Sequence, residues 1–189
     1  VLGARAYYML FYSPETFFSD FLKIHDGGLA IYGGIIGAFV GIVISCKTRK
    51  IPFLDCLDLV APCFFIGQAI GRWGNFFNQE AFGGNTDLPW GMTGNIIQAG
   101  VNGSGYDTAL PVHPTFLYES LWNILGFVII AFIYRKKKFN GQMALTYFAW
   151  YGFGRMLIEG LRTDSLLIGL FRVSQLVGAV TFLVGGAIM

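Results

Sequence analysis

Charged residues are scarce in this sequence, and their scarcity excludes several classes of protein. Only 13% of the 189 residues are charged, whereas 54% are hydrophobic and 17% are aromatic. The formal net charge is +2, which argues against a nucleic-acid partner because phosphate binding needs a concentrated basic face. This balance is typical of a chain embedded in lipid rather than of a soluble domain.

Cysteines and familiar catalytic motifs are few as well. Cys46, Cys56 and Cys63 lie in or beside apolar runs without metal-ligand spacing, so we interpret them as buried small hydrophobic residues. No HExxH, P-loop or GxGxxG motif occurs. The letters NGSGY at 102–106 resemble a serine-protease motif in spelling only, since they fall in a polar stretch. We therefore predict no metal site and none of these enzyme classes.

Long apolar runs are what the sequence has in place of charge. Crossing about 30 Å of hydrocarbon takes roughly 20 residues, and backbone hydrogen bonding in lipid makes such runs helical. Five or six runs qualify, the first one weakly because it contains Pro14. The predicted spans are 3–19, 28–46, 54–72, 115–134, 143–161 and 167–188.

These runs predict an all-α fold, a polytopic transmembrane bundle of about six helices that forms one membrane domain over residues 1–189. Residues 73–113 are rich in Gly, Asn, Asp and Pro, so we expect a small extramembrane head segment there. Gly33, Gly37 and Gly41 have the spacing that lets transmembrane helices pack closely.

Two basic clusters predict the orientation of the bundle. KTRK at 47–50 and RKKK at 135–138 follow the second and fourth runs, and both should be cytoplasmic by the positive-inside rule. Threading the helices between these clusters places Arg5 inside. The segments expected outside are the KIHDGG turn at 23–28, residues 73–113 and residues 162–165.

The stretch GRWGNFFNQEAFG at 71–83 places polar groups where the chain should leave the membrane. Arg72 is followed by Asn75, Asn78 and Glu80. The glycines in this stretch permit a tight, non-helical path that would aim these groups at one point. A guanidinium with amide donors suits a phosphate oxyanion, because its planar fork donates to two oxygens. In the alternative interpretation, Arg72 only snorkels to the headgroups.

A second polar group lies in YGFGRMLIEGLR. Tyr151, Arg155 and Glu159 are spaced i, i+4 and i+8, so they share one face of a helix. Intramembrane Arg and Glu side chains normally face a bundle interior or an aqueous cavity, which makes this stripe a functional hypothesis. The alternative is a purely structural Arg155–Glu159 ion pair.

Two further stretches carry polar candidates. In HPTFLYES, His113 precedes a helix that carries Glu119, a carboxylate that should seek a cationic partner. Alternatively, His113 and Thr115 only shape the start of that helix. In GGLAIYGG, Tyr32 either anchors in the aromatic belt or hydrogen-bonds into a cavity.

Together these stretches resemble the prolipoprotein diacylglyceryl transferases, a family of bacterial inner-membrane enzymes. GRWGNFFNQEAFG is similar to the family signature, and GGLAIYGG, HPTFLYE and YGFGRMLIEGLR agree with three further blocks. The likeness covers nearly the whole chain. Family members are typically longer and have seven transmembrane helices. Because this sequence begins at Val1 without a signal-peptide layout, the resemblance implies that the first helix is missing.

The resemblance implies a multi-pass enzyme of the bacterial cytoplasmic (inner) membrane with its site toward the outer leaflet. Such an enzyme transfers the diacylglyceryl group of phosphatidylglycerol to the lipobox cysteine thiol of a prolipoprotein, the first step of lipoprotein maturation, and releases glycerol phosphate. No cofactor is expected, since the ester oxygen already belongs to a good leaving group. A lipid or anion transporter with intramembrane arginines is the rival hypothesis.

The family blocks, together with the polar residues in and beside them, predict the residue roles. The implied catalytic residues are Arg72, Arg155, Glu80 and Tyr32. The residues implied to bind phosphatidylglycerol are Arg72, Asn75, Asn78, Gly83, His113, Glu119, Tyr151 and Glu159. Many family members carry histidine in place of Tyr32, and a phenol with an ordinary pKa near 10 is a poor base. We therefore expect that this histidine is not an obligatory base. Glu80, Glu119 and Glu159 either position the guanidiniums or accept the thiol proton, and the sequence does not separate these two roles.

Overall fold

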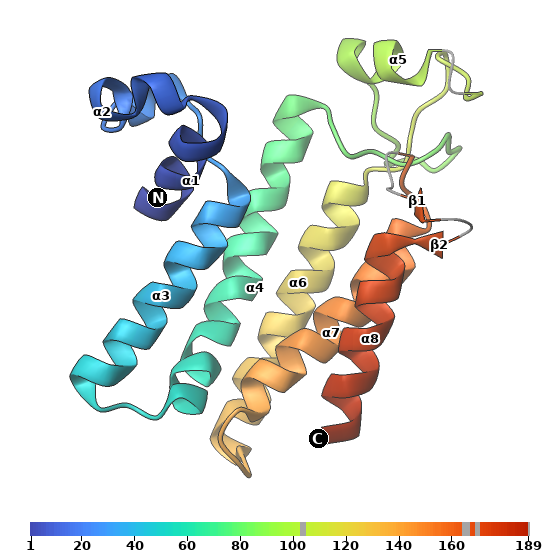
Figure 1. Cartoon of the computed structure of the whole chain (residues 1–189). Helices are drawn as coiled ribbons and strands as arrows, with labels where there is room; N and C mark the ends of the chain where they lie inside the picture. The colour runs from blue at the N-terminus through green and yellow to red at the C-terminus, as the bar shows by residue number, and fades with distance from the viewer. Residues whose placement is uncertain (103–104, 164–166, 169–170, 189) are drawn as a thin grey trace. The chain divides into compact units, whose positions relative to one another are not determined.

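The computed structural model describes residues 1–102, 105–163, 167–168 and 171–188. Among these residues the regular secondary structure is helical apart from one pair of two-residue strands, so the all-α fold class is confirmed in outline (Figure 1). The α-helices are α1 (Leu2–Tyr12), α2 (Phe17–Asp20), α3 (Ile31–Arg49), α4 (Phe53–Asn78), α5 (Asn95–Val101), α6 (Thr115–Ile133), α7 (Gln142–Glu159) and α8 (Val173–Ile188). Short 3-10 helices cover Pro14–Thr16, Ile24–Asp26 and Tyr134–Lys136, and β1 (Leu167–Ile168) pairs antiparallel with β2 (Phe171–Arg172).

Val1–Cys56 and Leu57–Met189 form two compact units, and each is described by itself. In the first unit, glycines bring α1 and α3 together. A Cβ on Gly37 would lie 3.1 Å from Gly3 Cα, and one on Gly33 would overlap the Gly3 carbonyl. The close packing predicted for Gly33 and Gly37 is therefore confirmed, whereas Gly41 faces open space.

The predicted span 3–19 is wrong. Helix α1 ends at Tyr12, and a 3-10 turn begins at Pro14, because proline fixes φ and disfavours helical geometry in the residue before it. The 11 residues of α1 extend only about 16 Å at 1.5 Å per residue, too short to cross a bilayer.

The sequence predicted that Arg5 and the KIHDGG turn lie on opposite sides of the membrane. This prediction is also wrong, because α1 is too short to separate them. Arg5 is only 4% exposed and donates five hydrogen bonds to backbone carbonyls of residues 20–28. A buried guanidinium needs acceptors, and the turn supplies them. Arg5 and this turn therefore lie at the same level of the first unit.

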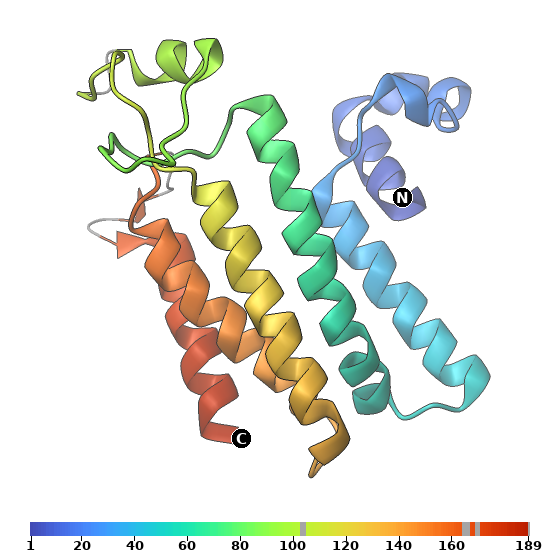
Figure 2. The same ribbon diagram turned by 180° about the vertical axis from the view of Figure 1, so that it is seen from behind.

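In the second unit, α4, α6, α7 and α8 lie side by side (Figures 1 and 2). Helices α7 and α8 approach closely because each carries a glycine at the contact. A Cβ on Gly152 would lie 2.5 Å from the Gly178 carbonyl oxygen. The hydrophobic core between the helices contains Ala61, Phe65, Ile130, Met143 and Tyr147.

Two helical stretches among the described residues, Phe53–Asn78 and Thr115–Lys136, are long and apolar enough to cross a membrane, and α8 is a shorter apolar helix. The membrane character is thus supported. The membrane crossing of the other predicted spans stays a prediction, although 28–46 and 143–161 do correspond to α3 and α7.

Two boundaries and one burial expectation differ from the predictions. Helix α4 continues to Asn78, and α8 begins only at Val173, because residues 167–172 include the β1–β2 pair. Cys46 is buried as expected, whereas Cys56 is only partly buried and Cys63 is exposed. An exposed cysteine on an apolar helix is compatible with a helix surface that contacts lipid.

The segment between α4 and α6 lies at the end of the bundle where α4 ends and α6 begins (Figures 1 and 2). It contains α5 and has a small core of its own with Met92, Ile97, Val101, Val112 and Phe116. Since Phe116 belongs to α6, this head segment is packed on the helix that carries Glu119.

Candidate functional site

The GRWGNFFNQEAFG motif is helical as far as Asn78, so the predicted non-helical path is wrong. Its glycines before Asn78 have open space around them and cost helix stability without forcing a turn. The chain reverses just after the helix. There, the side-chain amides of Asn75 and Asn78 each lie 3.1 Å from Glu80 Oε1, and the Glu80 N–H donates to the Asn75 carbonyl at 3.0 Å.

Gly83 lies where three segments of the chain meet. Its N–H donates to the His113 carbonyl at 2.9 Å, and it forms an isolated antiparallel bridge with Arg162. A Cβ at this position would lie 2.7 Å from His113 Cβ and 2.8 Å from the Leu161 carbonyl oxygen. Only glycine fits there, which ties the segment after α4 to those before α6 and after α7.

Glu119 is the centre of the charged site. It is 4% exposed, and its Oε2 lies 2.6 Å from Arg72 Nη2. Its Oε1 lies 2.9 Å from Arg155 Nη1 and 3.6 Å from Arg162 Nη1. The structure therefore brings Arg72 of α4 and Arg155 of α7 together on one carboxylate of α6.

Glu159 extends this cluster. Its Oε2 lies 2.5 Å from Arg155 Nη2, so the ion pair considered as a structural alternative exists, but as one part of a larger network. The cluster of Arg72, Arg155, Arg162, Glu119 and Glu159 carries three positive charges and two negative ones. Surplus charge that is largely withdrawn from water favours a bound counter-ion. This site is therefore suited to an anion.

Two arginines of this region were not among the predicted site residues. Arg162 was noted only as part of an exterior turn, although it is the last residue of YGFGRMLIEGLR. Arg172 donates hydrogen bonds to the backbone carbonyls of Glu159 and Arg162. It thereby satisfies carbonyls at the C-terminus of α7, a position that favours cations.

His113 takes part in a short hydrogen-bond chain at the start of α6. Its Nδ1 lies 3.1 Å from the Tyr118 hydroxyl, which accepts a hydrogen bond from Trp90 Nε1 at 3.1 Å. Thr115 donates through its hydroxyl to the Ala81 carbonyl, so it holds the segment that follows Glu80. Among the described residues, no group of three or more His, Cys, Asp or Glu side chains is placed to hold a metal ion.

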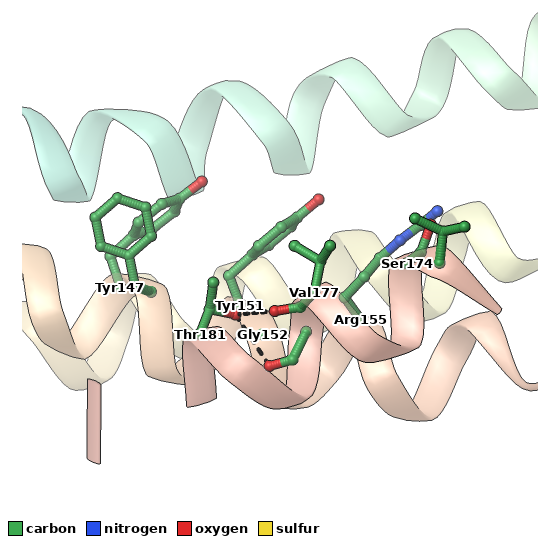
Figure 3. A pocket seen from close by; sticks show the side chains of 10 residues that line it. Tyr147, Tyr151, Gly152, Arg155, Ser174, Val177 and Thr181 are labelled. Carbon is green, nitrogen blue, oxygen red and sulfur yellow. Dashed lines mark hydrogen bonds between the residues drawn. The ribbon is translucent and has the colours of Figure 1, made fainter. Parts of the chain in front are cut away.

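A pocket of about 390 Å³ lies between α7 and α8. Its lining is mainly apolar, with Tyr151 and Arg155 on one side. Figure 3 shows Tyr147, Tyr151 and Arg155 projecting from α7 with their polar ends turned the same way, and the Tyr147 hydroxyl accepts a hydrogen bond from Gln68 Nε2 of α4 at 2.8 Å. Apolar space next to a guanidinium suits an amphiphilic anion.

Tyr32 belongs to the first unit and is 70% exposed. Its ring lies 6.3 Å from the ring of Tyr7. A part for Tyr32 in the chemistry stays a prediction.

Asp58 is a buried polar residue that the sequence patterns did not reveal. It is 1% exposed, and its carboxylate accepts hydrogen bonds from the backbone N–H groups of Gly141, Met143 and Ala144 at 2.8–3.0 Å. Lys137 Nζ lies 3.1 Å from the same carboxylate. Asp58 of α4 therefore caps the N-terminus of α7, the helix that carries Arg155.

Comparison with known proteins shows the family of the chain. The family model described as "Prolipoprotein diacylglyceryl transferase" matches residues 1–189. A phosphatidylglycerol–prolipoprotein diacylglyceryl transferase of Finegoldia magna is 45% identical over all of this chain, which covers 72% of that relative. Relatives of the same name from Ligilactobacillus salivarius and Listeria welshimeri are 44% and 45% identical over 97% and 93% of this chain, which covers 69% and 64% of their lengths. The chain with this arginine–glutamate cluster belongs to the prolipoprotein diacylglyceryl transferase family.

Proposed function

We propose that this protein transfers the diacylglyceryl group of phosphatidylglycerol to the thiol of a prolipoprotein's lipobox cysteine. The observation that carries the proposal is the meeting of Arg72 and Arg155 on Glu119, at 2.6 and 2.9 Å. A guanidinium has five N–H groups, so each arginine can contact a glutamate and still donate to a phosphate.

The reaction needs stabilisation mainly where negative charge develops. The thiolate sulfur attacks C3 of the lipid's glycerol backbone, the C3–O bond breaks, and its electron pair leaves on the phosphate as glycerol phosphate. Arg72 and Arg155 stabilise that charge, and a single preorganised donor contributes about 3 kcal/mol of barrier lowering. The chemistry requires no metal or organic cofactor, because phosphate is already a good leaving group.

The remaining polar residues position the lipid. Tyr151 lines the pocket beside Arg155 and orients the phosphate, while the apolar part of that pocket accommodates acyl-chain carbons. Glu119 and Glu159 hold the guanidiniums in place. Asn75, Asn78, Gly83 and His113 build the surrounding wall from the end of α4 and the start of α6.

We place the protein in the bacterial cytoplasmic membrane as a multi-pass protein whose membrane-spanning helices include α3, α4, α6 and α7. The basic residues 47–50 and 135–138 would lie on the cytoplasmic side, and the head segment outside. This orientation supports the proposed function, because exported lipobox cysteines and outer-leaflet phospholipid meet the site from the same side.

The test is a transfer assay. The purified protein is mixed with phosphatidylglycerol vesicles and a lipobox peptide, and the peptide is analysed by mass spectrometry. We expect a thioether-linked diacylglyceryl peptide and released glycerol phosphate. A lipid or anion transporter would move phospholipid between leaflets without forming this product. An Arg155→Lys variant should lose most activity, because lysine does not reproduce bidentate geometry.

A further inference from the structure

We propose that Glu80 is the catalytic residue that accepts the proton of the attacking thiol. This inference rests on the proposed function and chooses among three glutamates that the sequence leaves equivalent. It follows from what each carboxylate contacts.

Glu119 and Glu159 are already committed to arginines. Both oxygens of Glu119 are in ion-pair distance of guanidiniums, at 2.6 Å for Oε2 and 2.9 Å for Oε1. Glu159 Oε2 lies 2.5 Å from Arg155 Nη2. Protonating either carboxylate would break a largely buried ion pair and leave an uncompensated charge, which is strongly unfavourable. These two residues therefore hold the arginines.

Glu80 has different surroundings. Its described side-chain contacts are the neutral amides of Asn75 and Asn78, and both reach the same atom, Oε1. Glu80 is exposed and lies just after the end of α4 at Asn78. A proton can therefore reach Glu80 Oε2 without displacing an ion pair seen in the described residues, and can leave from there to solvent.

His113 is a titratable side chain in the same part of the chain, and its Nδ1 is already engaged. It lies 3.1 Å from the Tyr118 hydroxyl, which also accepts a hydrogen bond from Trp90 Nε1–H. Glu80 instead keeps one carboxylate oxygen, Oε2, outside its described hydrogen bonds with Asn75 and Asn78.

The backbone around Glu80 is held in an uncommon conformation. Gln79 and Ala81, the residues on either side, have φ values of +53° and +56°, and non-glycine residues rarely adopt this region unless their surroundings impose it. Those surroundings are present. Gln79 Oε1 accepts the Ile96 N–H at 3.0 Å, and the Thr115 hydroxyl donates to the Ala81 carbonyl. The fold thus fixes the position of Glu80 from both sides.

The proposed step balances as follows. The thiol proton passes to Glu80 Oε2, and the sulfur electron pair forms the S–C3 bond. The C3–O bond breaks, and its electron pair leaves on the phosphate oxygen. Glu80 then releases its proton to water, so the carboxylate is regenerated for the next turnover.

The test uses Glu80→Gln, which keeps an oxygen for Asn75 and Asn78 but cannot accept a proton. We expect kcat at neutral pH to fall about 10²- to 10⁴-fold, the usual contribution of a general base, with the KM for phosphatidylglycerol nearly unchanged. The residual rate should rise with pH, because hydroxide replaces the missing base. Added formate should partly restore a Glu80→Ala variant.

The matched control is Asp87→Asn, a change at another exposed carboxylate of the head segment, which should leave rate and pH profile unaltered. A Glu80→Gln variant within about threefold of the unmodified protein would overturn the inference. An equal loss at every pH, without rescue by formate, would also overturn it. Both outcomes require that the unmodified protein forms the thioether product. If it forms none, the proposed function itself fails.

Discussion

At Glu119, a single carboxylate determines where two arginines from different helices lie. The sequence predicted that Glu119 needs a cationic partner and that Arg155 and Glu159 share a helix face. It could not show that Arg72 and Arg155 would meet on Glu119, since that contact depends on the packing of α4, α6 and α7. Arg162 was missed because its contact with Glu119 is equally non-local.

Gly83 offers a test of how tightly the segments around this site are packed. A Gly83→Ala change would place Cβ 2.7 Å from His113 Cβ and 2.8 Å from a backbone carbonyl. We expect a loss of about 1–3 kcal/mol in stability, as for overpacking, and a fall in transfer activity. Thermal unfolding in detergent measures the first effect.

Gly71→Ala is the control for this change, because a Cβ at Gly71 meets nothing within 4 Å. It should be neutral or slightly stabilising in helix α4. Equal unfolding temperatures for Gly83→Ala and Gly71→Ala would show that the packing around Gly83 leaves room for a Cβ.

Tyr32 supplies a second prediction for a single residue. Tyr32→Phe removes only a hydroxyl from a side chain that is 70% exposed. We expect it to reduce transfer less than either Arg72→Ala or Arg155→Ala does, because it is not the base. The comparison needs initial rates of the three variants at equal protein concentration. A larger loss for Tyr32→Phe would reverse the view that Tyr32 is dispensable for proton transfer.

Among the secondary-structure elements, α7 depends on a cap that comes from another helix. Asp58 of α4 accepts backbone N–H groups at the start of α7, and α7 ends near Arg155 and Glu159. The residues that this contact joins are 83 to 86 positions apart in the sequence. Local patterns cannot reveal it, whereas apolar runs were sufficient to predict α3, α4, α6 and α7 as helices.

Asp58→Ala should therefore destabilise the second unit by about 2 kcal/mol or more, from a lost cap and buried N–H groups without partners. Asp58→Asn should cost less, because its oxygen can still accept from Met143 and Ala144. Unfolding midpoints of both variants provide the measurement. If Asp58→Ala unfolds like the unmodified protein, the cap does not hold α7.

The elements that sequence patterns misplaced are those where local chemistry competes with hydropathy. Pro14 divides the first apolar run, which composition alone treats as continuous. In the opposite sense, Gly71 and Gly74 suggested a turn but are tolerated inside α4. In the first case the proline was given too little weight against the hydropathy of the whole run. In the second case the two glycines were given too much weight against the helical pattern around them.

For the whole molecule, the distribution of basic residues predicts an orientation. No Lys or Arg occurs from residue 73 to residue 134, whereas 135–138 are all basic. Single cysteines introduced at Lys136 and Asp87 in a cysteine-free background should react from opposite sides of sealed membrane vesicles, Lys136 from the cytoplasmic side. Labelling of both positions from the same side would contradict the multi-pass arrangement.

The central claim is that Arg72 and Arg155 act on one phosphate, and a double-mutant cycle in kcat/KM for diacylglyceryl transfer tests it most directly. Arg72→Ala and Arg155→Ala should each reduce kcat/KM at least about a hundredfold. Because the two guanidiniums share Glu119 and the same anion, the double variant should be far less impaired than the product of the single losses. Near-normal rates in either well-folded single variant, or losses that multiply as for independent sites, would contradict the account.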